Sequence, residues 1–300
     1  MASSASNLFP TYHIRSISLP SRPNPFILNV DEHTRRLALY SETTTASSSS
    51  LLSSRLGELR DLYDSVDALL ELPRTQQLFA HGSHKDRVDG LLASSLCFLD
   101  VCGIAKDALL QTKEQLQDLQ SVLRRKRGDE SELIKESAKY LSSRKMSKKA
   151  ISKSLRDLKS KCSNLSSSEH EPNTEATFGK LRQVEMVSVD LFSSLLSFLS
   201  EPTAQSKTSS WALLSKLVYS SKHISYEGEP TKSSEFKNVD SMLQTLIDRK
   251  MRKNISIEKE GLQNELRRLE SSIQDLEEEL ESVVRRIIRT RAYLLNLLTN

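Results

Sequence analysis

The chain has 300 residues and a formal net charge of +4, with 37% hydrophobic and 27% charged residues. This hydrophobic content is below that of most compact globular domains, so we expect elongated helices with extensive exposed faces. A net charge this small excludes non-specific attraction to nucleic acid or anionic lipid as a property of the whole protein. Any such attraction must be local.

The apolar periodicity predicts an all-α fold. The eight prolines fall mostly near the N-terminus and between the apolar-periodic segments, where they would end helices. We expect an elongated helical bundle with a disordered N-terminal leader and a C-terminal coiled-coil helix. The expected units are the leader over 1–30, a short helix and Ser/Thr-rich linker over 31–50, the helical bundle over 51–230 and the coiled-coil helix over 231–300.

The leader contains no acidic residue and is rich in Ser, Pro and Asn, which is typical of disorder and also of a plastid transit peptide. Within it, Arg15, Ser16, Ser18 and Pro20 form the pattern R-S-x-S-x-P. Arg15 precedes Ser18 by three residues, which suits a basophilic kinase, and Pro20 suits exit from a phosphopeptide groove. A phosphate on Ser18 would present about −2 charge to an Arg cluster, as in recognition by 14-3-3-type adaptors. A plain Ser/Pro-rich tail would explain the same residues.

Apolar residues that alternate steps of four and three predict the helices of the bundle. In the longest of them the expected seam includes Leu92, Leu96 and Leu109, and Gly128 follows a basic last turn, as helix C-termini favour. The expected helices span 31–40, 52–72, 75–80, 83–126, 130–161, 178–199 and 211–219.

The C-terminal segment has the most regular pattern. Its apolar residues alternate steps of four and three over five heptads, which is the 3.5-residue repeat of a coiled coil. At about 1.5 Å per residue the helix would be on the order of 50 Å long. The seam could dock on the 83–126 helix or pair with a second chain as a homo-oligomer. It comprises Leu262, Leu266, Leu269, Ile273, Leu276, Leu280, Val283, Ile287, Leu294 and Leu297.

A basic block lies between Arg124 and Lys161, where fourteen Lys and Arg accompany five Asp and Glu, a local net charge of +9. Such a field could bind anionic lipid or nucleic acid, although Tyr140 is its single aromatic residue, so base stacking is poorly served and nucleic acid is not favoured. A solvated face that complements the acidic segment 258–281 would explain the same cations. The basic patch comprises Arg124, Arg125, Lys126, Arg127, Arg144, Lys145, Lys148 and Lys149.

No motif indicates a catalytic residue, a metal site or a cofactor. The chain has no Gly-rich phosphate loop and no GxSxG, and its six histidines lack the neighbours of a metal site. The three cysteines form no CxxC pair, which suits a reducing compartment. No run of about 18 apolar residues predicts a transmembrane segment. We expect an intracellular protein, with the cytoplasm favoured and the plastid as the alternative.

The leader segment Tyr12–Pro25 looks like the signature opening of a plant-specific family of unknown molecular function called BYPASS-like. In this segment Pro23-Asn24-Pro25 departs from the Ser-His-Pro ending of relatives. The resemblance continues in blocks over nearly the whole chain and implies a plant protein of root and shoot development, with some members labelled chloroplastic. It supplies no catalytic or binding residues. The further blocks are Leu62–Asp67, Leu70–Pro73, Leu99–Gly103, Leu123–Lys126, Ser142–Lys145 and Arg285–Leu298.

The residues and the resemblance therefore predict a non-enzymatic helical scaffold or regulatory protein in root and shoot development. It would act through protein contacts and the Ser18 phospho-motif. The expected partners are proteins, among them a 14-3-3-type adaptor and a second copy of this chain. The alternative function is binding of anionic lipid or nucleic acid through the basic block.

Overall fold

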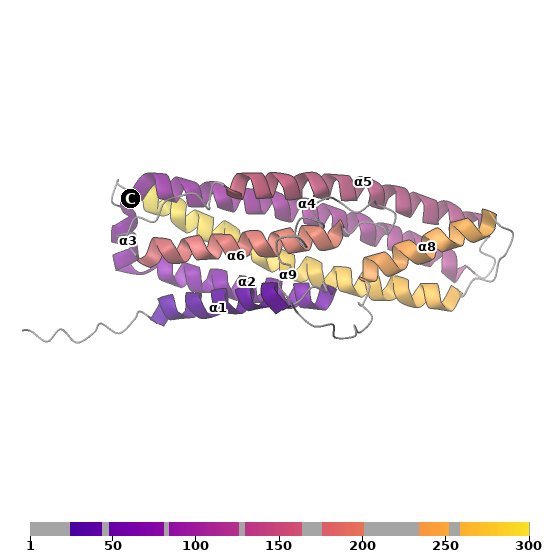
Figure 1. The fold of residues 1–300 in the computed structure, drawn as a ribbon, viewed down its shortest axis with the longest axis horizontal. Helices are drawn as coiled ribbons and strands as arrows, with labels where there is room; N and C mark the ends of the chain where they lie inside the picture. Colours follow the sequence, from indigo (N-terminus) through magenta and orange to yellow (C-terminus); the bar gives the residue numbers. More distant parts are fainter. Residues whose placement is uncertain are drawn as a thin grey trace, which may run out of the picture.

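In its described residues the chain forms eight α-helices and no strand (Figure 1), which confirms the predicted all-α class. The structure is a computed structural model and describes residues 25–43, 48–80, 84–125, 130–163, 176–200, 234–251 and 259–299. The helices are α1 (Pro25–Thr43), α2 (Ser49–Leu70), α3 (Pro73–Ala80), α4 (Lys85–Arg124), α5 (Glu130–Ser163), α6 (Ala176–Leu199), α8 (Glu235–Met251) and α9 (Lys259–Thr299).

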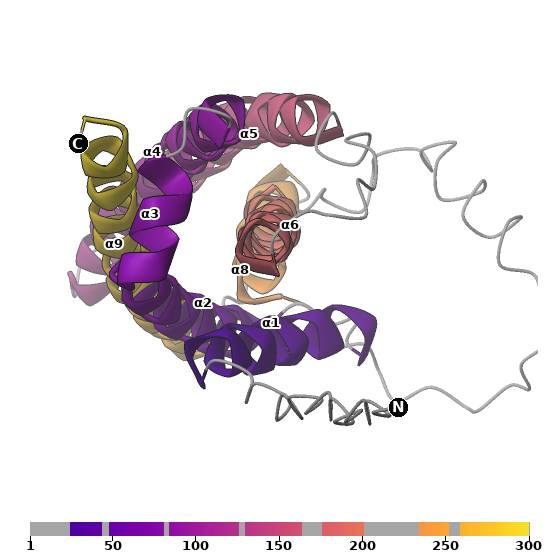
Figure 2. The same ribbon diagram turned by 90° about the vertical axis from the view of Figure 1, so that its left-hand side faces the viewer.

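Five long helices form an arc in the order α1, α2, α9, α4 and α5 when the molecule is viewed along its long axis (Figure 2). Each helix packs on the next one in this order, and the C-terminal α9 thus lies between α2 and α4. α6 fills the concave side of the arc and contacts α1, α2, α4 and α5. α8 follows α6 along the same axis and packs on α5 and α9.

The central position of α6 explains its strongly apolar composition, because a helix with neighbours on several sides buries several faces. Phe192 of α6 is fully buried and its ring centroid lies 5.4 Å from that of Phe98 in α4. Near the end of α6, Phe198 meets Phe236 of α8 edge-on at 5.5 Å. These aromatic contacts join α6 to α4 on one side and to α8 on the other.

The heptad seam of α9 is buried within the chain, because α2 and α4 cover it. α2 runs parallel to α9, since Ser49 contacts Ser272 and Asp67 contacts Thr290. The sequence left open whether α9 packs on α4 or pairs with a second chain. In the structure α9 packs on α4 and also on α2. A homo-oligomer through this seam would require α9 to leave both helices. The fully buried seam residues are Leu266, Leu269, Ile273, Leu276, Leu280, Val283 and Ile287.

Some helix boundaries and one core position differ from the expectation. α1 begins at Pro25 instead of residue 31, since proline fits the first position of a helix. Two helices, α8 and α9, occupy the segment 231–300 that was expected to hold one coiled-coil helix. Leu96 is 50% exposed, because Ser95 and Phe98 take the buried positions of that turn of α4. The helix expected over 211–219 lies outside the described residues.

Among the described residues one helix, α4, is long and apolar enough to cross a membrane by length and composition, with a mean hydropathy of 1.7 over 18 residues. No such helix was predicted, because the sequence has no run of about 18 apolar residues. Of that stretch, 44% is buried inside the bundle, where α5, α6 and α9 pack on it. A core helix of a bundle has the same composition as a membrane span, so this one helix is weak evidence for a span.

Truncation at the seam should be far more destabilising than truncation on the outer face of the same helix. Ile273 is fully buried and Ile288 is 52% exposed, and both lie in α9. We expect Ile273→Ala to lower the free energy of unfolding by about 2–5 kcal/mol, because it leaves a cavity. Ile288→Ala should change it by less than about 1 kcal/mol. Urea unfolding at pH 7 measures both, and equal losses would contradict the burial of the seam.

Candidate functional site

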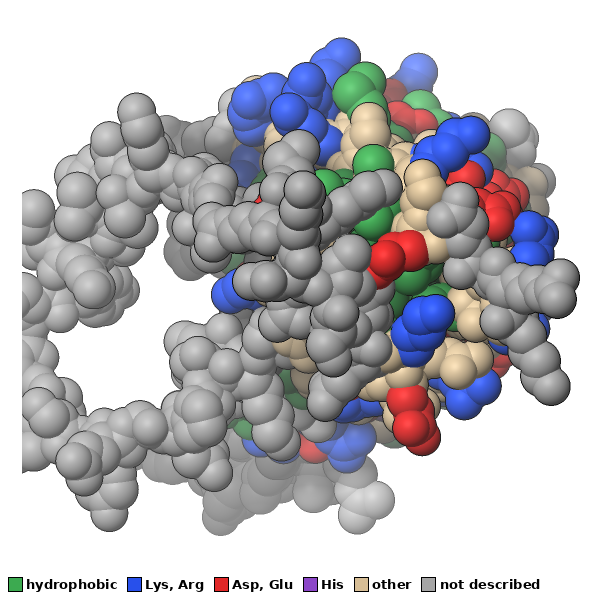
Figure 3. Space-filling model, turned by 90° about the vertical axis from the view of Figure 1, so that its right-hand side faces the viewer, with side chains coloured by type: hydrophobic (Ala, Val, Ile, Leu, Met, Phe, Trp, Pro, Cys, Tyr) green, Lys and Arg blue, Asp and Glu red, His purple; other side chains and the backbone are tan. Residues whose placement is uncertain are grey.

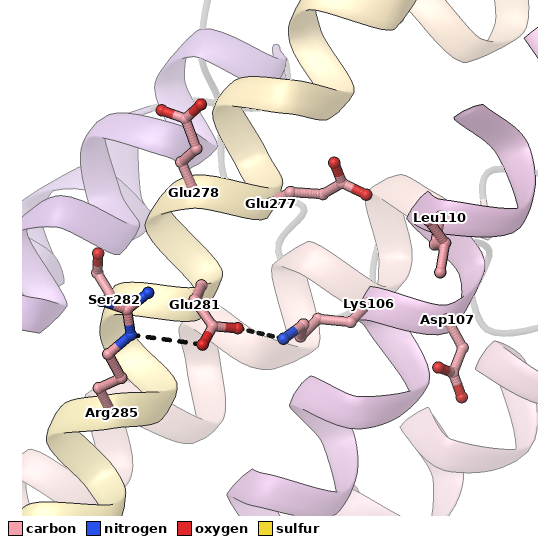
Figure 4. Close-up of a pocket in the computed structure, with 8 residues that line it drawn as sticks. All are labelled: Lys106, Asp107, Leu110, Glu277, Glu278, Glu281, Ser282 and Arg285. Carbon is pink, nitrogen blue, oxygen red and sulfur yellow. Dashed lines mark hydrogen bonds and ion pairs between the residues drawn. The ribbon is translucent and has the colours of Figure 1, made fainter. Parts of the chain in front are cut away.

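An open groove of about 490 Å³ runs between α4 and α9 (Figure 4). In it Glu281 of α9 accepts hydrogen bonds from Lys106 of α4 and from Arg285, the latter at 3.4 Å. The hydrogen bond from Lys106 holds the pKa of the Glu281 carboxyl below its ordinary value, with Arg285 acting in the same direction. Nearby, Glu277 pairs with Lys113 at 2.7 Å. The groove is therefore crossed by ion pairs that hold α9 on α4.

The opposite side of α9 is tied to α2 by further ion pairs. Glu279 lies 3.2 Å from Arg60, and Arg286 lies 2.9 Å from Asp64. The acidic part of α9 thus complements cations of α4 and α2. This corrects the expectation that the acidic segment 258–281 complements the basic block, because no ion pair joins α5 to α9 in the described residues.

A buried carboxylate, Asp67 of α2, stands at the end of this contact. It is 2% exposed, accepts a hydrogen bond from Thr290 Oγ1 at 2.5 Å, and lies 3.4 Å from Arg289 Nε. Burial raises the pKa of Asp67 to about 6, although the hydrogen bond from Thr290 and the charge of Arg289 oppose that rise. At neutral pH the fold therefore holds a carboxylate in a poorly solvated place.

A small cavity of about 40 Å³ lies next to this contact, between α2, α4, α6 and α9. Its lining includes Glu185, which is 7% exposed, and Tyr63, whose hydroxyl lies 3.2 Å from Ser188 Oγ. Burial raises the pKa of both Glu185 and Tyr63 above their ordinary values. A volume this small admits water, whereas ligand pockets measure hundreds of Å³.

The predicted basic patch does not form one surface, because some of its α5 residues face the interior of the bundle and others face solvent. Arg144 is 2% exposed, with its guanidinium 4.4 Å above the ring of Phe236 and its Nε 3.7 Å from Oδ1 of Asp240 in α8. Lys148 donates to the other oxygen of Asp240 at 2.8 Å. A buried ion pair contributes little net stability, since desolvation offsets much of the attraction, but it is unfavourable when broken. These two cations therefore fix where α8 docks on α5.

The other residues of the patch differ in their surroundings. Arg124 donates to Gln120 at 2.8 Å and Arg125 pairs with Glu132 at 3.0 Å, both near the connection between α4 and α5. Lys145 and Lys149 are exposed and have no ion pair in the described part of the chain. Lys126 and Arg127 lie outside the described residues, as do Arg15, Ser16, Ser18 and Pro20 of the leader.

Asp67 and Asp240, which join helices distant in sequence, were not among the predicted site residues. Each had a signal, because each interrupts an apolar face at helical spacing: Asp67 follows Tyr63 by four residues, and Asp240 follows Phe236 by four. An acid on a buried face is expected to meet a partner.

The described residues contain no group of three or more His, Cys, Asp and Glu that could hold a metal ion. Cys97 and Cys102 are free and buried, and burial raises the pKa of the Cys102 thiol to about 12. Free cysteines in such positions pack as small apolar side chains do.

Replacement of Asp67 by Asn should change the pH dependence of stability. The pKa of Asp67 is about 6 in the fold and 3.8 ordinarily. Between these two pH values the Asp67 carboxyl is therefore more often protonated in the folded than in the unfolded protein. Stability from this group therefore falls as pH rises from 4 to 7. We expect the free energy of unfolding of the wild type, relative to Asp67→Asn, to fall by up to about 3 kcal/mol over this range. Urea unfolding at several pH values measures this, and a constant difference would contradict it.

The family model described as Protein BPS1 matches residues 55–297, from the first turns of α2 almost to the end of α9. Comparisons with curated proteins and with solved structures find no match. The resemblance to this family is thereby confirmed, with the leader segment lying outside the matched range. That range contains both the seam of α9 and the Arg144–Asp240 pair. The chain therefore belongs to the plant-specific BPS1 family, whose membership points to a role in plant development.

Proposed function

We propose that this protein is a non-enzymatic helical scaffold in root and shoot development, and that it works through protein contacts at two places. One is the solvent-exposed side of α4, and the other is a phosphorylated Ser18 in the leader. The observation that carries the proposal is a pair of large apolar side chains on the surface: Leu110 of α4 is 52% exposed and Met146 of α5 is 62% exposed.

Leu110 and Met146 form what we call the α4 ridge, which has a groove on each side of Leu110. Leu110 and Asp107 line the groove between α4 and α9. They also line a second groove, of about 550 Å³, between α4 and α5, together with Met146 and Glu114. Apolar side chains within a polar rim are typical of protein contacts.

The chemistry of the ridge favours a basic amphipathic helix as the partner element. Such a helix would place its apolar face on Leu110 and Met146, and its cations would face Asp107, Glu114 and Glu278. The two grooves run beside α4, so a helix lying along them would follow the long axis of the bundle.

The leader supports the second contact through its sequence. Arg15 and Pro20 flank Ser18 at the positions that a basophilic kinase and a phosphoserine groove favour. A phosphate there would bring about −2 charge to the Arg cluster of a 14-3-3-type adaptor.

Charge placed on the ridge should remove the partner without unfolding the bundle. We expect Leu110→Glu with Met146→Glu to keep the helical circular dichroism of the wild type, because both side chains are exposed. The measurement is the native mass of the protein in extracts of root tissue that lacks the endogenous protein. We expect the variant to have the native mass of the free chain and the wild type to have that of a larger complex.

The matched control is Leu28→Glu, since Leu28 is 49% exposed on α1, away from the ridge. This variant should keep the larger complex. An unchanged complex in the double variant, or an equal loss in the control, would count against the ridge.

Loss of the Ser18 hydroxyl should weaken adaptor binding strongly. We expect the full chain phosphorylated by a basophilic kinase to bind a recombinant 14-3-3 protein, and Ser18→Ala to bind at least about tenfold more weakly, because the phosphate supplies the charge-assisted hydrogen bonds. Ser21→Ala is the control, since no basic residue lies three positions before Ser21. Isothermal titration calorimetry gives the affinities, and equal binding by Ser18→Ala would exclude this site.

A further inference from the structure

The outer face of α5 carries a stripe of four cations, which we call the α5 stripe: Lys145, Lys149, Lys153 and Arg156. All four are exposed, and none has an ion pair within the part of the chain that the structure describes. At about 100° per residue they fall within an arc of about 80°, and they extend over about 16 Å of the helix. The stripe is therefore a compact positive surface.

The stripe lies opposite the face by which α5 packs on the bundle. That buried face carries Tyr140, Ile151 and Leu158, all fully buried. Two other cations of this helix, Arg144 and Lys148, turn inward and meet Asp240. Figure 3 shows Lys and Arg side chains gathered along the upper edge of one end of the bundle, the side on which α5 runs.

Few acidic side chains oppose these charges. The sequence has no Asp or Glu between Glu136 and Asp157, and Glu136 is paired with Lys139 at 3.2 Å. On the neighbouring α4, Asp107 and Glu114 line the groove beside Met146, at the edge of the exposed face of α5. The positive field therefore points away from α4, outward from the bundle.

From this arrangement we infer that the α5 stripe binds the surface of a membrane rich in anionic lipid, with the long axis of the bundle parallel to that surface. This binding is additional to the proposed scaffold role and needs neither Ser18 nor the α4 ridge. All four cations can reach one plane at the same time, because they lie on one side of one helix. Each basic residue near an anionic bilayer strengthens binding by about fivefold.

The shape and composition of the stripe favour lipid over the other polyanions. The groove next to it is lined by Asp107 and Glu114 and by none of the four cations, so an acidic peptide finds no concave seat on the stripe. None of the exposed residues of the stripe is aromatic, so nucleic-acid bases would have nothing on which to stack. A flat anionic surface requires neither feature.

Flotation with phosphatidylcholine vesicles that contain 30% phosphatidylserine tests the inference, with vesicles of pure phosphatidylcholine beside them. We expect the full chain to bind the anionic vesicles and not the pure phosphatidylcholine vesicles. In 500 mM salt it should bind the anionic vesicles more weakly. The variant Lys145→Gln, Lys149→Gln, Lys153→Gln and Arg156→Gln should bind on the order of several hundredfold more weakly.

The matched control removes the same charge from scattered exposed positions, through Arg74→Gln, Lys237→Gln, Lys259→Gln and Arg267→Gln. It should keep most of the binding, with helical circular dichroism unchanged in both variants. Equal loss in the control would overturn the inference, because binding would then follow total charge.

A second variant leaves every cation in place. Ser152 is exposed within the stripe, and Ser271 is exposed on α9. We expect Ser152→Asp to weaken vesicle binding by about fivefold and Ser271→Asp to leave it unchanged. Failure of the wild type to bind anionic vesicles would overturn the inference, and binding of polyglutamate or RNA in their place would identify another polyanion as the ligand.

Discussion

The burial of one face of α9 between α2 and α4 is the contact on which the rest of the architecture depends. The arc has α9 at its centre, so α1 and α2 on one side and α4 and α5 on the other are joined through it. A repeat of 3.5 residues keeps the same stripe facing the same neighbours over the length of a long helix. In this protein a coiled-coil pattern serves packing within one chain. The outer faces of α4 and α5 remain exposed to solvent.

The charged residues of the bundle have two different roles, and burial separates them. Ion pairs at the edges of α9, such as Arg60 with Glu279, are partly exposed and add little stability each, but they fix the register between helices. The Arg144–Asp240 pair is buried and selects where α8 docks, since either partner alone would be an uncompensated charge. Because α5 directs Arg144 and Lys148 inward, its remaining cations are concentrated on the outside.

Much of the fold follows from apolar periodicity, and the helices α2, α4, α5 and α6 lie within a few residues of their expected ranges. Periodicity finds a buried face, but it does not name the helix that covers it. The contact of α9 with α2 joins residues about two hundred positions apart, such as Asp67 and Thr290. A run of basic residues predicts one positive surface and does not indicate the inward turn of Arg144. The signal for that turn is the spacing, because Arg144 follows Tyr140 by four residues on the apolar face. The leader motif stays a prediction.

The position of α9 late in the sequence has a consequence for how the protein is made. While the ribosome has synthesised only the residues before 259, the faces of α2 and α4 that α9 covers are already present and uncovered. Contacts between segments this distant in sequence form slowly, and exposed apolar faces promote aggregation during the delay. The nascent chain is therefore expected to need a chaperone until α9 emerges, and a premature stop codon before or within α9 would leave the whole arc open.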